Sequence, residues 1–291
     1  MATQHPFAVA ETDRSVAGDF EDLLGERHYV IRNVDHMAPF FMSVVSHNNR
    51  WLFASSNGGL TAGRVSADTA LFPYVTVDKI HDSATHTGCR TLLRVTRSGN
   101  TTEWQPFDPH RHPDAPIQRS LYKHVLGNSV CFEEAHQALG LVFRYRWQFS
   151  DRFGFIRECW LENTGDRTVD VALLDGLRNI LPAGTPRFAQ TNTSNLVDAY
   201  KWTEVDSETG LACFTLYSAI TDRAEPAESL RANTVFSIGL DDATLLLGDT
   251  QLDAFRSGHG LAPERHTRGV RGDYLAATSL TLAPGETRRW Y

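Results

Sequence analysis

The sequence contains few cysteines, and they form no recognisable pattern. None of the four belongs to a CxxC pair, and they are widely separated: Cys89, Cys131, Cys159 and Cys213. Zinc knuckles and disulfide frameworks both depend on regularly spaced cysteines. We therefore predict neither, and we interpret the four residues as buried free thiols of a reducing compartment, the cytoplasm.

Long hydrophobic runs and basic clusters are also missing. No apolar run approaches the roughly 20 residues of a membrane-spanning helix, and residues 1–7 lack the basic and apolar regions of a secretory signal. The 28 lysines and arginines are outnumbered by 35 acidic residues, which gives a net charge of −7. We therefore expect neither a membrane nor a nucleic acid as partner.

The short motifs of common catalytic and cofactor sites are absent. There is no G-x-S-x-G, H-E-x-x-H or dinucleotide fingerprint, so we predict no cofactor. The pattern closest to a metal site is the His-x-His pair within 108–114, but it lies in the proline-rich stretch 106–116, and we interpret it as a solvated loop. Glu133 and Glu134 are adjacent in an expected strand, so they point to opposite faces and form no catalytic pair. Glu158 and Glu162 share one face of an expected strand, and we expect them to form cross-strand ion pairs.

Alternating apolar residues are abundant and predict strands through most of the chain. In Leu141–Phe149 every second residue is apolar or aromatic, which is typical of a half-buried strand. Together with 153–162 and 168–175, this segment predicts an antiparallel meander. Further strand-like runs span 27–34, 39–46, 50–54, 71–77, 90–96, 129–134, 211–218, 234–240 and 243–247. We predict an all-β, two-sheet antiparallel sandwich with few helices, since 291 residues are nearly three times a sandwich of about 100.

Two segments predict short helices, Asp13–Leu24 and Ser194–Glu204. We accordingly expect an N-terminal extension with a short helix at 1–26 and the β-sandwich domain at 27–291. The segment 273–291 predicts two strands joined by a Pro-Gly turn and ends on the aromatic pair Trp290 and Tyr291. From this ending we expect the chain to be one domain of a longer protein.

Two polar segments are candidates for contact with a carbohydrate. Glycines in 51–74 permit close backbone approach, and the same segment supplies side chains that suit sugar rings and hydroxyls: Trp51, Asn57, Arg64, Asp68 and Tyr74. The alternative is a hairpin with a glycine bulge. In 173–184 a strand is expected to end at a turn that presents Arg178 and Asn179, either to a sugar or partner domain or to the turn's own carbonyl groups.

Three segments together resemble a known family. They are FSDRFGFIRECWLENTGD at 149–166, DGLRNILP at 175–182 and LAPGET at 282–287. From about Arg27 onward the chain resembles the N-terminal β-supersandwich of multidomain glycoside phosphorylases and hydrolases, in particular cellobiose phosphorylase-like and β-1,2-oligoglucan phosphorylase-like proteins. This domain is similar in fold to galactose mutarotase.

The resemblance implies a non-catalytic, architectural domain that contacts β-gluco-oligosaccharides. Catalysis is then the task of a following (α/α) helical toroid in the same polypeptide, and a homodimer is a further implied assembly. One alternative is a free-standing aldose epimerase on the same fold, which needs a histidine and a carboxylate close together, here His124 with Glu133 or Glu134. The other is a structural or protein-interaction sandwich without affinity for sugar.

Overall fold

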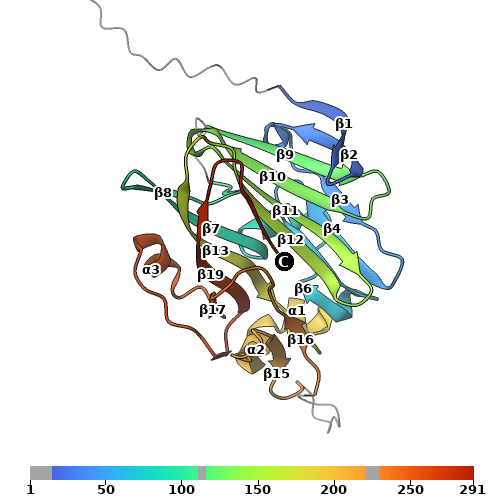
Figure 1. Ribbon diagram of the computed structural model, residues 1–291. Helices are drawn as coiled ribbons and strands as arrows, with labels where there is room; N and C mark the ends of the chain where they lie inside the picture. The colour runs from blue at the N-terminus through green and yellow to red at the C-terminus, as the bar shows by residue number, and fades with distance from the viewer. Residues whose placement is uncertain (1–14, 111–115, 221–229) are drawn as a thin grey trace, which may run out of the picture.

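The computed structural model describes residues 15–110, 116–220 and 230–291, and strands dominate these residues (Figure 1). The predicted all-β fold is confirmed, because the described strands pair antiparallel in four sheets. The largest sheet has seven strands, in the order β1-β2-β9-β10-β11-β12-β20. Its strands are β1 (Ala17–Leu23), β2 (Glu26–Arg32), β9 (Ile117–His124), β10 (Val130–His136), β11 (Leu141–Ser150), β12 (Gly154–Asn163) and β20 (Thr287–Trp290).

A five-stranded sheet packs against the inner face of the seven-stranded sheet and shares its main hydrophobic core. Its order is β17-β19-β13-β7-β8, so strands from the middle and the end of the chain are neighbours. Its strands are β17 (Thr244–Leu246), β19 (Gly272–Leu282), β13 (Val169–Ile180), β7 (Gly88–Arg97) and β8 (Asn100–Trp104).

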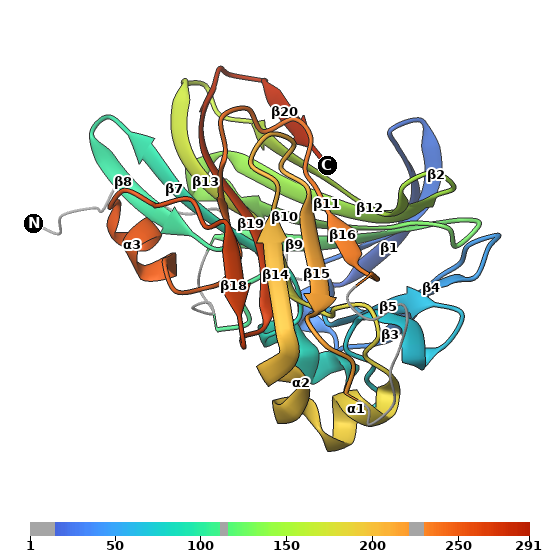
Figure 2. The same ribbon diagram turned by 90° about the horizontal axis from the view of Figure 1, so that it is seen from below.

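Two four-stranded sheets and short helices complete the described fold. One sheet contains β3 (Phe41–Val44), β4 (Arg50–Ser55), β5 (Leu60–Arg64) and β6 (Ala70–Phe72). The other contains β16 (Asn233–Val235), β15 (Ala212–Leu216), β14 (Lys201–Val205) and β18 (His266–Arg268). Figure 2 shows α1 (Arg187–Asn192) and α2 (Ser194–Tyr200) together at one end, and α3 (Leu252–Ser257) beside β7 and β8. The short 3₁₀ helices are η1 (Val34–His36), η2 (Ala67–Thr69), η3 (Ile80–Thr85) and η4 (Gln137–Leu139).

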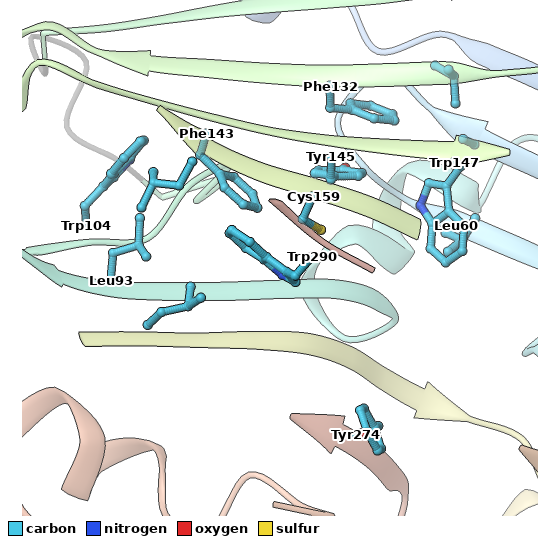
Figure 3. Packing of buried hydrophobic residues seen from close by; sticks show 14 of the residues in the cluster. Leu60, Leu93, Trp104, Phe132, Phe143, Tyr145, Trp147, Cys159, Tyr274 and Trp290 are labelled. Carbon is cyan, nitrogen blue, oxygen red and sulfur yellow. The ribbon is translucent and has the colours of Figure 1, made fainter. Parts of the chain in front are cut away.

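Aromatic side chains fill the space between the two large sheets. The inner face of β11 carries Phe143, Tyr145 and Trp147, as its alternation predicts. The Tyr145 ring stacks on Phe132 with centroids 4.8 Å apart, and Trp290 stacks on Phe143 at 6.0 Å (Figure 3). Strand β20 therefore completes the core, because the Trp290 ring is inserted between the sheets.

A buried ion pair joins the two large sheets across this core. Arg157 of β12 makes a bidentate contact with Asp175 of β13, with N–O distances of 2.7 and 2.9 Å. The carboxylate also accepts hydrogen bonds from the Thr91 hydroxyl at 2.6 Å and from the Trp290 indole N–H at 2.7 Å. The opposite charge of Asp175 outweighs burial and holds the pKa of Arg157 well above its usual range.

Three predictions of local structure are wrong. Residues 17–23 form the edge strand β1 rather than part of the helix expected over Asp13–Leu24, while 1–14 lie outside the described residues. The chain reverses at Leu24 and Gly25, both with positive φ, and Phe20 then packs on Tyr29 of β2. The helix expected over Ser194–Glu204 ends at Tyr200, where the chain enters β14. Strand β13 does not end at Asp175 but continues to Ile180.

Two further findings concern the cysteines and the helices. All four cysteines are free thiols, and Cys131 and Cys159 are buried. Burial raises the pKa of each of these two thiols. No helix in the described residues is long and apolar enough to span a bilayer.

Candidate functional site

One cavity is apolar and lies at one end of the space between the large sheets. Its volume is about 320 Å³. Aromatic side chains form much of its wall: Trp147, Phe153, Phe155, Phe236, Tyr274, Trp290 and Tyr291. The ion pair of Arg157 and Asp175 also lines this cavity, but both Asp175 oxygens already accept hydrogen bonds. Of the predicted contact residues, Arg64 lines this apolar cavity.

A second, smaller cavity of about 160 Å³ has polar and apolar groups in similar shares in its lining and is called the polar cavity below. It forms because β8 pairs only with residues 93–97 of β7, which leaves the first half of β7 uncovered. The chain after β8 then leaves the sheet and forms one wall. Polar side chains that line it are Asn57, Arg90, Gln105, Asp108, His110 and Arg178, and two aromatic residues, Phe107 and Tyr145, contribute rings.

Glu134 anchors the wall that follows β8. Its carboxylate is fully buried and accepts hydrogen bonds from the Trp104 indole, the Phe107 backbone N–H and the Arg119 guanidinium, each at 2.7 Å. Arg119 in turn donates to the backbone carbonyl of Asp108 at 2.8 Å. The Phe107 ring then packs against Tyr145 with centroids 5.2 Å apart. The wall is therefore connected to the sandwich core by a buried charged group.

Arg178, a predicted contact residue, both lines the polar cavity and supports it. Its guanidinium donates to the carbonyls of Thr85 at 2.6 Å, Ala84 at 3.1 Å and Cys89 at 3.3 Å. The sequence-based alternative for this residue, capping of nearby carbonyls, therefore describes its hydrogen bonds. Burial, together with the neighbouring charge of Arg90, lowers the pKa of Arg178 to about 10.

Asn57 is the second predicted contact residue at the polar cavity. Its side-chain oxygen accepts from the Gly59 N–H at 3.2 Å, and its amide donates to the His81 carbonyl at 3.0 Å. A Cβ atom at Gly59 would lie 2.0 Å from the Ile80 carbonyl oxygen, so only glycine fits. The turn after β4 is thus held rigidly against η3, with Asn57 at the cavity wall.

The other residues predicted in 51–74 do not converge on the polar cavity. Trp51 and Tyr74 contact each other edge to face at 6.0 Å. Asp68 accepts a hydrogen bond from the Arg187 N–H at 2.8 Å, at the start of α1. The segment forms the β4–β5 hairpin, and a register shift at Ala62 and Gly63 interrupts the pairing of β5 with β6, which matches the alternative of a hairpin with a glycine bulge.

Asn179 occupies a buried position with a left-handed backbone, φ +56°. Its N–H donates to Oδ1 of Asp273 at 2.9 Å, and its side-chain amide donates to the Thr87 hydroxyl at 3.1 Å. The residue orders the end of β13 next to Arg178. We find no direct role for it in lining either cavity.

The histidine and the carboxylate of the epimerase alternative are kept apart by the strand register. Glu133 pairs with Ser120, four residues before His124 on β9, which corresponds to a separation of about 13 Å along the strand. Glu133 forms an ion pair with Arg144, and the His124 ring instead contacts His28 at 5.1 Å. Glu134 points into the core, so neither carboxylate meets this histidine.

Two other predictions about charged residues can be compared with the structure. The cross-strand ion pairs expected for Glu158 and Glu162 are present, with Arg146 at 2.7 Å and Arg144 at 2.8 Å. In the predicted His-x-His loop, His110 lines the polar cavity, while 111–115 lie outside the described residues. In the part of the chain that is described, no three His, Cys, Asp or Glu side chains cluster to hold a metal.

Sequence reasoning missed several residues of the polar cavity, among them Arg90, Gln105 and Phe107. Arg90 lies in a segment predicted only as an apolar strand. Gln105 and Phe107 lie beside or within a proline-rich stretch interpreted only as a surface loop. One signal was available, because an aromatic residue in such a loop needs a place to pack. Phe107 meets this need against Phe132 and Tyr145.

Asp273 next to the polar cavity gives a prediction for pH dependence. Burial raises the pKa of its carboxyl to about 6, above the ordinary value of 3.8, so the folded state binds this proton more tightly. The stability that this proton contributes is full below pH 3.8 and is lost as the pH rises through 6. We expect Asp273→Asn, which keeps an acceptor for the Asn179 N–H, to raise the free energy of unfolding at pH 8 by about 3 kcal/mol.

Urea unfolding of both proteins from pH 4 to pH 8 measures this difference. Other titrating groups near Asp273, including His86, contribute equally to the stability of both proteins. The difference between the two free energies of unfolding therefore reports on Asp273 alone. The two curves should converge near pH 4. A variant less stable than the wild type at pH 8 would show that the ionised carboxylate is favourably paired, contrary to the expectation.

The comparison with known proteins assigns no family to the chain. No protein-family model matches the sequence, and no curated protein is found that is significantly similar to it. A proposal of function therefore depends on the geometry of the cavities and on the sequence resemblance described above.

Proposed function

We propose that the chain is a non-catalytic, carbohydrate-contacting and architectural domain of a glycoside phosphorylase or hydrolase that acts on β-gluco-oligosaccharides. The observation that carries the proposal is the polar cavity, where amide, imidazole and guanidinium groups surround the rings of Phe107 and Tyr145. Sugars present hydroxyl groups at their edges and C–H groups on their faces, and such a mixed lining suits both.

The size of the polar cavity limits what it would hold. At about 160 Å³ it is smaller than the roughly 300–1,000 Å³ of sites that enclose a drug-sized molecule. The cavity would therefore hold one terminal ring, with the rest of the oligosaccharide outside. The sequence resemblance supplies the choice of a β-linked glucan.

Catalysis is proposed to take place elsewhere, in a following helical domain. Most glycosidic hydrolysis uses two carboxyl groups that flank the scissile bond. Asp108 is the one carboxylate among the described residues that line the polar cavity, and its Oδ1 accepts the His110 N–H at 2.9 Å. A cytoplasmic location and a homodimer are parts of the proposal that come from the sequence alone.

Substitution of Gln105 tests the proposed contact site. Its side chain lines the polar cavity, and its oxygen accepts one hydrogen bond, from Arg256 at 3.2 Å. We expect Gln105→Ala to weaken binding of a β-gluco-oligosaccharide about 3–10-fold, because a hydrogen bond contributes about 0.5–1.5 kcal/mol. Isothermal titration calorimetry with cellotetraose and with a β-1,2-linked tetraose measures the effect.

The matched control is Gln118→Ala, since Gln118 is a half-buried glutamine of β9 that lines neither cavity. This variant should bind as the wild type does. Absence of binding by the wild-type chain at millimolar sugar would reject the carbohydrate proposal. It would instead support a sandwich that serves only in assembly.

A further inference from the structure

We propose that the polar cavity selects an acidic sugar, one whose ring carries a carboxylate or a phosphate group held by Arg90. The inference depends on the proposed function and deepens it, because it names the terminal ring of the gluco-oligosaccharide that the same cavity takes: a glucose ring that carries an acidic group. It predicts a charge preference that a site for neutral glucan would not have.

Arg90 is the observation that carries the inference. It lies half-buried on β7 and lines the cavity, yet its guanidinium has no hydrogen-bond or ion-pair partner among the described residues. A guanidinium has five N–H donors in a rigid fork that matches a carboxylate or phosphate. Burial of a charged group without a partner is unfavourable, so a bound anion would compensate Arg90 for lost hydration.

Arg178 adds a second positive charge at the same cavity. Its N–H groups that face Thr85, Ala84 and Cys89 are in use, but its Nε is buried without an acceptor in the described part of the chain. The charges of the two arginines repel each other, and this repulsion contributes to the lowered pKa of Arg178. An anion between them would relieve that repulsion.

The nearby carboxylates do not take the place of such an anion. Asp108, Asp249 and Asp273 all attract Arg90, but none lies within ion-pair distance of it. Asp108 accepts the N–H of His110 with its Oδ1, and Asp273 accepts the N–H of Asn179. Arg256 is the neighbouring cation whose charge most lowers the pKa of Arg90, and it pairs with Glu103, which does not line the cavity. The donor fork of Arg90 is therefore the free group at this site.

The test compares small probes that differ only in charge. Glucose, glucuronic acid, glucose 6-phosphate and inorganic phosphate are each titrated into the wild-type chain at low ionic strength, with heat as the readout. We expect one of the two acidic sugars to bind at least 10-fold more tightly than glucose. The carboxylate and phosphate arms show which anion the cavity takes.

Two variants connect the preference to Arg90. Arg90→Gln should lower affinity for the preferred acidic sugar about 10–100-fold, the equivalent of one or two charge-assisted hydrogen bonds, and should thereby reduce the preference for that sugar over glucose. The matched control is Arg94→Gln, on the same face of β7 but lining neither cavity. Its affinities should equal those of the wild type. Circular dichroism confirms that both variants are folded.

Three results would overturn the inference. Equal affinity for glucose and both acidic sugars would reject the charge preference while leaving the proposed function intact. Inorganic phosphate that binds as tightly as glucose 6-phosphate would show an anion site without sugar recognition. Absence of binding by any probe and by the neutral oligosaccharides would reject the proposed function together with the inference.

Discussion

Replacing Asp175 with asparagine should lower the free energy of unfolding by about 3–5 kcal/mol, because Arg157 is then left buried without a counter-charge. Asp175 is only 3% exposed, and its carboxylate accepts hydrogen bonds from Arg157, Thr91 and Trp290. An amide at this position offers one acceptor oxygen and places N–H donors against these donors. Urea unfolding at pH 7 measures the loss.

A surface variant and a double variant serve as controls for Asp175→Asn. Asp253→Asn removes an exposed ion pair with Arg256 and should cost less than about 0.5 kcal/mol. Combining Arg157→Met with Asp175→Leu removes both buried charges, so part of the lost stability should return. A loss below about 1 kcal/mol for Asp175→Asn would mean that Arg157 finds another acceptor or that water enters the apolar cavity.

We expect Glu134→Gln to cost a similar 3–5 kcal/mol and also to abolish ligand binding at the polar cavity. All three partners of the carboxylate are donors, from Trp104, Phe107 and Arg119. A glutamine amide can satisfy them only in part, so the wall after β8 should lose its connection to the core. Hydrogen exchange of the Phe107 N–H, together with urea unfolding, measures this loosening.

The neighbouring residue gives a matched control for Glu134→Gln. Glu133 lies on the opposite face of the same strand, where Arg144 would keep Glu162 as a partner after substitution. We therefore expect Glu133→Gln to lose about 1–2 kcal/mol and to leave the exchange of the Phe107 N–H unchanged. If both variants lost the same stability and both exposed Phe107, the two faces of β10 would not be distinct in the way described.

The fold was predictable where the alternation of apolar and polar residues distinguishes a strand from a helix. The pattern over Leu141–Phe149 identified β11 and the aromatic residues that fill the core. The prediction was wrong at Ala17–Leu23. The apolar residues there also fit one face of a helix, and only their pairing with β2 makes this segment a strand. A helical pattern over Ser194–Glu204 likewise extended past Tyr200, so the start of β14 at Lys201 was not predicted. The pairing that makes this segment a strand involves residues far along the chain.

The candidate site was predictable only in fragments. Asn57 and Arg178 were identified as polar groups near turns, and both line the polar cavity. Arg90 and Gln105 carried no local signal, because nothing in the sequence shows that the first half of β7 is left uncovered by β8. Trp51 and Tyr74 contact each other and line neither cavity, so their predicted contact with a sugar stays a prediction.

The sequence by itself determined the class of fold, the opposite orientation of Glu133 and Glu134, and the cross-strand pairing of Glu158 and Glu162. These features follow from the two-residue period of a strand, which is local. Only the tertiary structure decided that Asp175 meets Arg157 inside the core and that Arg90 stands without a partner beside Arg178. Such pairings depend on the order and register of strands distant in the chain, which no local pattern specifies.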